Sequence, residues 1–170
     1  MIGRQRYDHV LAIYPNARGF GFVLLEGPLA PLDWAVVEVR GTARNRECIR
    51  RVAVLFGKYS PNALVLQNTA PTGPGVRRTK RICDLNDAIL TLAETQSIPT
   101  FTYSRAQVQD AFRQFGEPTK QLIAEWIAKH IPAFERYVPV TRKPWMSESA
   151  RMGIFDAAAL ALTHFWQSQD

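Results

Sequence analysis

Cysteine is scarce in this sequence of 170 residues, which contains only Cys48 and Cys83. The two lie far apart, and neither has a second thiol or a histidine at the spacing of a metal site. We therefore expect buried free thiols in a reducing compartment, the cytoplasm, with a zinc site or a disulfide as the alternative.

Long apolar runs are absent as well. None approaches the roughly 20 residues of a membrane-spanning helix, and the basic N-terminus lacks the apolar stretch of an export signal. The sequence also has no glycine-rich loop for a nucleotide phosphate and no nucleophile motif. Its three histidines are scattered, and we expect each to be structural: His9, His130 and His164. The sequence thus predicts no membrane contact and offers no motif of a nucleotide-binding enzyme.

What the sequence does contain is typical of one folded domain spanning residues 1–170. Apolar residues make up 46% and charged residues 21%, so the chain is not of the disordered class. Lys and Arg number 21 against 15 Asp and Glu, which gives a net charge of +6 and a pI near 9.7. This excess favours a polyanionic partner such as nucleic acid, although a generic basic surface would give the same count.

The hydrophobic pattern predicts an α/β protein with a mixed five-stranded sheet flanked by helices. Short apolar runs predict strands at residues 9–13, 20–26, 34–39, 63–66 and 99–103. Amphipathic or apolar stretches predict helices at residues 45–59, 80–95, 104–112, 119–130 and 149–166, with a loop at 131–145. Three antiparallel strands followed by two parallel ones, joined through helices, match the element order of the ribonuclease-H-like fold.

One acidic residue stands out in the last predicted helix. Asp156 is a lone carboxylate in an otherwise apolar stretch, where a buried charge needs a metal, a cation or hydrogen bonds. The alternative is an Asp at the helix edge, facing water or Arg151. Glu148 is a second candidate, but eight residues of straight helix would separate the two by about 12 Å. They would meet only if residues 144–147 fold Glu148 back; otherwise it is a first-turn charge that favours the helix dipole.

Basic residues gather where the fourth strand leads into the second helix. Ligands of open α/β sheets bind at the carboxyl ends of parallel strands, so we expect a phosphate grip there, a solvated helix face being the alternative: Arg77, Arg78, Lys80 and Arg81. Lys120 and Arg105 start two further helices, where a cation opposes the helix dipole and suggests an external anion. Tyr14, at the end of the first strand, is interpreted as a packing residue, with a nucleophile as the alternative.

Four segments together resemble the RuvC-type Holliday-junction resolvases of the ribonuclease-H-like superfamily. They are VLAIYPNARGFGFV (10–23), ALVLQN (63–68), RAQV through TKQL (105–122) and FDAAALALTH (155–164). The resemblance implies a homodimeric, Mg²⁺-dependent endonuclease that cuts branched DNA, in which four acidic residues hold two metal ions.

The acidic positions of the family are only partly conserved in this sequence. The closing-helix Asp corresponds to Asp156, but the first-strand Asp falls on Tyr14 and the fourth-strand Glu on Gln67. The remaining acidic position falls on Gly153, and Glu148 could supply that carboxylate from nearby. A weak Mg²⁺ site, or none, is expected from this set.

Three hypotheses follow. The first is a RuvC-like protein that binds branched DNA and has impaired or lost nuclease activity, with Asp156 and Glu148 as remnants of the site. The second is an active Mg²⁺-dependent junction endonuclease in which these two residues and phosphate oxygens hold one ion. The third is a non-catalytic interaction module.

Overall fold

The computed structural model describes residues 8–69 and 78–168 and contains a five-stranded sheet in the order β3-β2-β1-β4-β5. Its strands are β1 (His9–Asn16), β2 (Gly19–Glu26), β3 (Pro31–Glu38), β4 (Ala63–Gln67) and β5 (Thr100–Tyr103). Strands β1, β2 and β3 pair antiparallel, whereas β4 pairs parallel with both β1 and β5. The predicted mixed sheet of three antiparallel and two parallel strands is confirmed.

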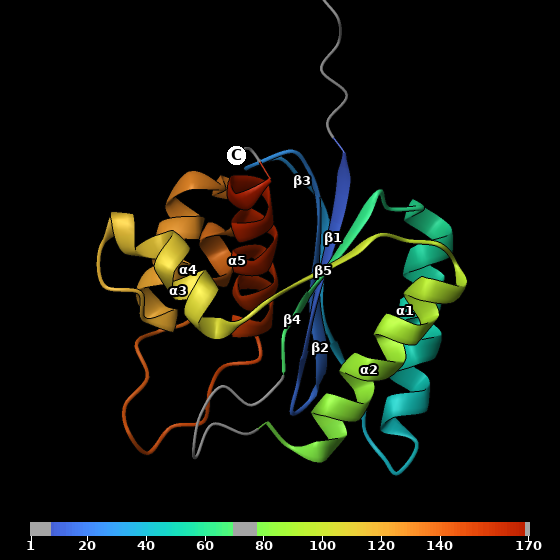
Figure 1. The fold of residues 1–170 in the computed structure, drawn as a ribbon. Coiled ribbons are helices and arrows are strands. Elements are labelled where there is room, and N and C mark those ends of the chain that lie inside the picture. The colour runs from blue at the N-terminus through green and yellow to red at the C-terminus, as the bar shows by residue number, and fades with distance from the viewer. Residues whose placement is uncertain (1–7, 70–77, 169–170) are drawn as a thin grey trace, which may run out of the picture.

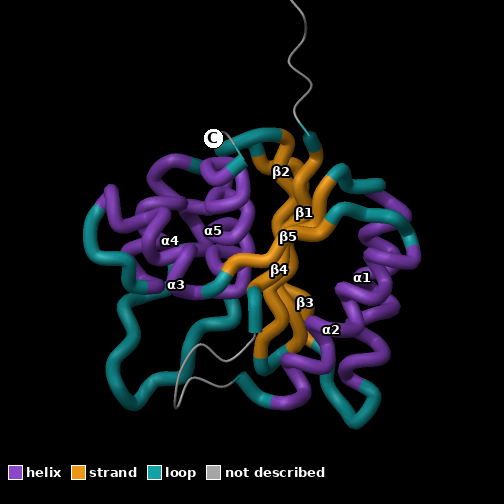
Figure 2. The backbone as a smooth tube through the Cα atoms, viewed as in Figure 1, coloured by secondary structure: helices purple, strands orange, loops and turns teal. Residues whose placement is uncertain are grey.

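Helices cover both faces of this sheet (Figure 1). One face carries α1 (Arg44–Tyr59) and α2 (Lys80–Thr95). The other carries α3 (Arg105–Phe112), α4 (Lys120–His130) and α5 (Met152–Gln167), with short 3-10 helices at Arg113–Phe115 and Pro132–Tyr137. Figure 2 shows the strands as one layer between these two groups of helices. No helix in the described residues is long and apolar enough to cross a membrane.

Burial on both faces explains why β1 and β2 are apolar at nearly every position. Successive side chains of a strand point to opposite faces. Val10 and Ala12 of β1 therefore pack toward α5, whereas Leu11 and Ile13 pack toward α1 and α2. The sheet thus separates two apolar cores, and only the ends of its strands remain available to polar chemistry.

The approach of α5 to the sheet depends on two glycines. A Cβ atom on Gly21 of β2 would lie 2.3 Å from the backbone oxygen of Gly153 in α5, which is far inside van der Waals contact. A Cβ on Gly153 would lie 3.1 Å from Nδ2 of Asn16. The family's fourth acidic position therefore coincides with a helix–sheet contact that leaves little room for a side chain.

Three details of the sequence-based prediction are corrected. Strand β1 continues through Tyr14, Pro15 and Asn16, which were predicted to form a turn, because these residues pair with β2. Pro15 is accommodated because the described pairing of β1 with β4 stops at Ala12. Helix α5 begins at Met152 rather than at residue 149, and the predicted loop at 131–145 contains the 3-10 helix Pro132–Tyr137.

The two cysteines are free, as expected, although only Cys48 is buried and Cys83 is half-buried.

Candidate functional site

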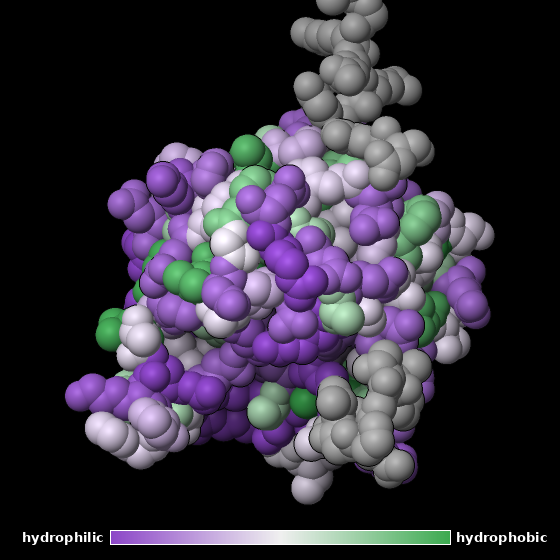
Figure 3. Space-filling model, turned by 60° about the vertical axis from the view of Figure 1, so that its left-hand side comes forward, coloured by the Kyte–Doolittle hydropathy of each residue, from purple (hydrophilic) through white to green (hydrophobic). Residues whose placement is uncertain are grey.

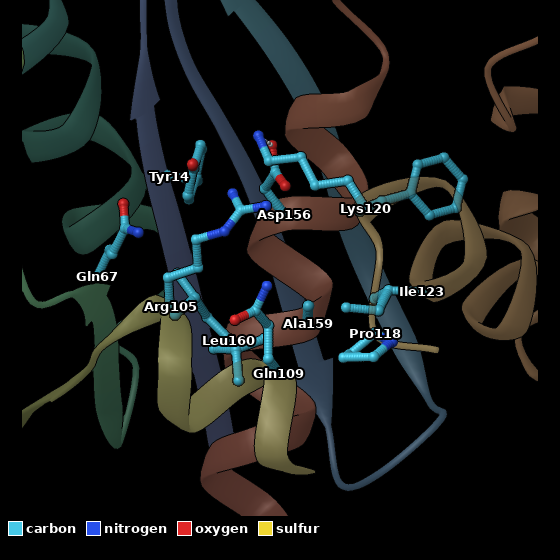
Figure 4. A pocket seen from close by; sticks show the side chains of 12 residues that line it. Tyr14, Gln67, Arg105, Gln109, Pro118, Lys120, Ile123, Asp156, Ala159 and Leu160 are labelled. Atoms are coloured by element: carbon cyan, nitrogen blue, oxygen red, sulfur yellow. Dashed lines mark hydrogen bonds and ion pairs between the residues drawn. The ribbon is translucent and has the colours of Figure 1, made fainter. Parts of the chain in front are cut away.

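The candidate site lies where β1 and β4 end, at the edge of the sheet to which α4 and α5 both contribute (Figure 4). Tyr14 comes from β1, and Gln67 is the last residue of β4. Lys120 is the first residue of α4, whose N-terminus is capped by a hydrogen bond from the backbone N–H of Leu122 to Oγ1 of Thr119. Asp156 lies in the second turn of α5. Four separate elements thus converge at one edge of the sheet.

The Lys120 ammonium is the centre of this arrangement. Its Nζ donates to Oε1 of Glu148 at 2.9 Å and to Oδ2 of Asp156 at 3.5 Å, and it lies 5.5 Å from the centroid of the Tyr14 ring. The side chain of Asp156 is 13% exposed and that of Lys120 is 28% exposed. One cation therefore compensates two carboxylates in a largely desolvated place.

These neighbours shift the pKa values of the site. Burial raises the pKa of Asp156 to about 6, and the nearby Glu148 adds to the rise, whereas the Lys120 ammonium opposes it. Burial acts to lower the pKa of Lys120, but its acidic neighbours, Asp156 first, outweigh it and the net pKa is raised. Burial, followed by the charge of Asp156, also raises the pKa of Tyr14. At neutral pH the site therefore holds a charged lysine and a neutral phenol, which is not the state of an activated tyrosine nucleophile.

Arg78 also lies against the Tyr14 ring. Its guanidinium carbon lies 4.7 Å from the centroid of the Tyr14 ring, and one nitrogen donates to the backbone oxygen of Pro15 at 2.7 Å. The other nitrogen donates to the side-chain oxygen of Gln67. The amide of Gln67 thus binds a guanidinium where the family's carboxylate would bind a metal ion.

Two further arginines bind the turn after β1. Arg81 donates to the backbone oxygen of Asn16 at 2.8 Å and to Oδ1 of Asn45 at 3.1 Å, and Arg44 donates to the backbone oxygen of Ala17 at 2.7 Å. Together with Arg78, they bind three consecutive backbone carbonyls. Arg81 therefore has a structural role that the sequence did not indicate, since the prediction placed it in a phosphate grip.

The remaining predicted cations differ in their availability. Lys80 is exposed and pairs with Asp84 at 2.7 Å, and Arg77 lies outside the described residues. Arg105 lines the same pocket as Tyr14 and Lys120 and has no hydrogen-bond or ion-pair partner among the described residues. Among the predicted phosphate-binding cations that the structure describes, Arg105 is thus the one that lines the pocket without a protein partner, and it is available to an external anion.

Glu148 reaches the site by a route that its sequence spacing did not favour. Because α5 starts at Met152, Glu148 precedes the helix and is not the first-turn charge that was preferred from spacing. The segment before α5 brings it to Lys120, and the side chain of Arg18 donates to the Glu148 backbone oxygen at 3.4 Å. The fold-back that the sequence offered as its other alternative is therefore the one observed.

The residues present do not fit the Mg²⁺ that the family resemblance implies. Mg²⁺ binds through carboxylates, phosphates and water, but the two carboxylates here share an ammonium, and the Gln67 oxygen accepts from Arg78. No group of three or more His, Cys, Asp or Glu side chains that could hold a metal occurs within residues 8–69 and 78–168. The site is therefore cationic where the family's is acidic.

Around this site the surface is hollowed. One pocket, lined by Tyr14, Arg105 and Asp156, lies between α3, α5 and the sheet, and a second cavity of about 430 Å³ lies between Lys120 and the segment before α5. In Figure 3, hydrophilic side chains surround a hollow in the lower half of the face shown. An extended polar ligand therefore has room on both sides of Lys120.

Comparison with known proteins shows which solved structures share this fold. No protein-family model matches the chain, and no curated protein sequence matches it. Among solved structures, Thermus thermophilus RuvC in complex with a Holliday junction substrate superposes with a TM-score of 0.70 at 20% identity, covering 95% of both chains. A second structure of Thermus thermophilus RuvC gives 0.63 at 21% identity, again covering 95% of both chains. Ydc2, the yeast mitochondrial Holliday junction resolvase, gives 0.65 at 14% identity, covering 96% of this chain and 80% of its own. The chain therefore has the RuvC-type, ribonuclease-H-like fold that its sequence resembles.

Proposed function

We propose that this protein binds branched DNA through its RuvC-type fold and that its metal-dependent cleavage is impaired or lost. The observation that carries the proposal is the Lys120 ammonium, which contacts both Asp156 and Glu148. The ammonium supplies a positive charge beside the two carboxylates, where a bound metal ion would otherwise supply it.

The charge distribution supports binding to a polyanion. The chain carries a net charge of +6. Lys120 and Arg105 line the pocket beside the ends of β1 and β4, and Arg78 lies against the ring of Tyr14, which lines the same pocket. DNA phosphates would add acceptors for these cations without requiring a carboxylate cluster. That one structural neighbour was solved with a Holliday junction substrate supports the choice of a branched ligand.

The same proposal includes a homodimer, which the family resemblance implies. A four-way junction presents pairs of equivalent arms, and a two-fold symmetric protein would contact two of them in the same way. Sedimentation of the free protein and of its junction complex measures this directly: one protomer per junction at saturation would remove the dimer from the proposal.

Binding is tested with a four-way junction and a linear duplex of matched arm sequence, both in EDTA. We expect the junction to bind more tightly, with an affinity that falls as salt rises, because phosphate contacts release counterions. If the protein does not bind the junction at low salt, the proposal is wrong and a non-catalytic interaction module is favoured.

Cleavage is tested with the same junction in Mg²⁺ or Mn²⁺, with Asp156→Asn as the matched control. We expect no cleavage by the wild type above that of the control. Cleavage that the substitution abolishes would instead establish an active nuclease in which Asp156, Glu148 and phosphate oxygens hold one ion.

A gain-of-function variant tests whether Tyr14, Gln67 and Lys120 are the residues that prevent metal binding in the wild type. The triple variant Tyr14→Asp, Gln67→Glu, Lys120→Met introduces carboxylates at two of the family's acidic positions and removes the ammonium. We expect Mn²⁺ to raise the melting temperature of the triple variant but not that of the wild type or of Lys120→Met alone. An equal Mn²⁺ response in the wild type would show that Lys120 does not exclude the ion.

A further inference from the structure

The segment between the 3-10 helix Pro132–Tyr137 and α5 presents an exposed tryptophan. Trp145 is 78% exposed, and its described ring contact is the Lys143 ammonium, which lies 5.3 Å from the ring centroid. A hydrogen bond from the backbone N–H of Met146 to the oxygen of Lys143, at 2.9 Å, closes a turn with Pro144 and Trp145 at its tip. Proline favours the first of the two central turn positions, so the sequence itself favours the turn that displays the indole ring.

This turn is held beside the candidate site by the first residues of α4. The side-chain nitrogen of Gln121 donates to the backbone oxygen of Pro139 at 2.8 Å, and Lys120 binds Glu148 at 2.9 Å. The two ends of the segment are thus anchored to adjacent residues, and the cavity of about 430 Å³ lies between them. In Figure 1 the segment projects as the orange-red loop beyond the lower ends of α4 and α5. The aromatic side chain therefore belongs to the surface that flanks the site.

The charges of the segment indicate the kind of partner. Arg142, Lys143 and Arg151 are its cations, and its one acidic residue, Glu148, is paired with Lys120. Exposed Met146 lies in the same segment and adds apolar surface. A cationic turn with a solvent-exposed indole is complementary to a ligand that combines phosphates with a flat aromatic face, which describes a nucleotide whose base is unstacked.

We infer that Trp145 stacks on an unpaired or unstacked base at the branch of the DNA while Arg142 and Lys143 contact the flanking phosphates. This inference rests on the proposed function, since it assigns the part of the molecule that distinguishes branched DNA from duplex. Bases inside a continuous duplex stack on each other and present no free face, whereas a branch point exposes such faces. The stacking therefore contributes to junction binding and little to duplex binding.

The test compares the wild type with Trp145→Ala, Trp145→Phe and the matched control Val140→Ala, which truncates another exposed apolar residue of the same segment. Affinities for the four-way junction and for the linear duplex are measured in EDTA. We expect Trp145→Ala to weaken junction binding about five-fold or more, the lower end of base–aromatic stacking, and to leave duplex binding within about two-fold. Trp145→Phe retains most of the affinity because it keeps an aromatic face, and Val140→Ala binds as the wild type does.

Fluorescence gives a second readout that does not depend on affinity. The chain has four tryptophans, so the difference between the emission of the wild type and that of Trp145→Phe isolates the signal of Trp145. We expect the junction to quench this difference signal. Wild-type junction affinity in Trp145→Ala, or a difference signal that DNA does not change, would overturn the stacking but leave the proposed function standing. A wild type that binds no DNA would overturn both.

Discussion

Replacing Lys120 with methionine tests the electrostatic account of the site most directly. The substitution keeps most of the aliphatic stem and removes the ammonium that contacts Asp156 and Glu148. Asp156 then loses its compensating charge while it stays largely buried. We expect the variant to fold, to be less stable than the wild type, and to lose more stability at alkaline than at acidic pH.

The magnitude follows from the geometry. Two unit charges 3.5 Å apart attract each other by about 5 kcal/mol at an effective dielectric constant near 20. The Lys120 side chain is 28% exposed, so solvent screens part of this attraction, and we expect a loss of about 2 kcal/mol at pH 8. At pH 5 the Asp156 carboxyl is mostly protonated, because its pKa lies at about 6, and the loss is smaller.

The pH dependence has a definite sign. The pKa of Asp156 rises from 3.8 to about 6 in the folded protein, so its protonated form stabilises the fold. That contribution is complete below about pH 4 and is lost as the pH rises to about 6, above which the wild-type curve levels off with respect to this group. Removing Lys120 raises the pKa of Asp156 further, so the variant continues to lose stability above pH 6.

Urea unfolding of both proteins between pH 4 and pH 9 measures this difference. The matched control is Lys80→Met, because Lys80 forms an ion pair with Asp84 that is exposed to solvent and is expected to contribute little. Equal destabilisation by Lys120→Met at pH 5 and pH 8, or a loss no larger than that of the control, would refute the reasoning.

Three further predictions concern residues around the site. Asp156→Asn removes the titrating carboxyl, so its free energy of unfolding in urea at pH 8 should exceed that of the wild type by up to about 3 kcal/mol, and the contribution of Asp156 to the slope between pH 4 and pH 6 should disappear. Gly21→Ala should destabilise by about 3 kcal/mol or more in thermal unfolding because its Cβ would meet α5, whereas Gly57→Ala, with open space around its Cβ, should be neutral or stabilising. Arg81→Met should lower the free energy of unfolding by about 2 kcal/mol, because the Asn16 carbonyl loses a charged donor; a fully stable variant that loses only DNA affinity would assign this arginine to phosphate binding instead.

Much of the fold could be predicted because local patterns carry it. The helix predicted at residues 104–112 illustrates this: it is observed as α3, which begins with a capping box in which Ser104 and Gln107 exchange hydrogen bonds. Strand β4 was predicted from a compact apolar run and is buried along most of its length. Strand β1 was predicted too short, because Pro15 is a turn signal in sequence and only its pairing with Phe20 in β2 shows that the strand continues.

The site was predicted in its members but not in its contacts. Asp156, Tyr14, Gln67 and Lys120 were each identified from the sequence, but the contact of Lys120 with Asp156 and Glu148 was not. Lys120 lies 36 residues from Asp156 in sequence, and no local pattern indicates that the two side chains meet at 3.5 Å. The backbone role of Arg81 was missed for the same reason, because its acceptor on Asn16 is 65 residues away.

The sequence by itself determined the alternation of strands and helices, the net positive charge, and the substitution of Tyr14 and Gln67 for the family's carboxylates. These properties belong to single residues or to short periodic patterns, which hold whatever the rest of the chain does. Only the tertiary structure decided where the charges compensate each other. Helix α4 places the ammonium of Lys120 between Asp156 of α5 and Glu148 of the preceding segment, and burial then makes that contact electrostatically strong. Two carboxylates from different segments thereby become partners of one lysine, because the distances between remote elements are set by packing.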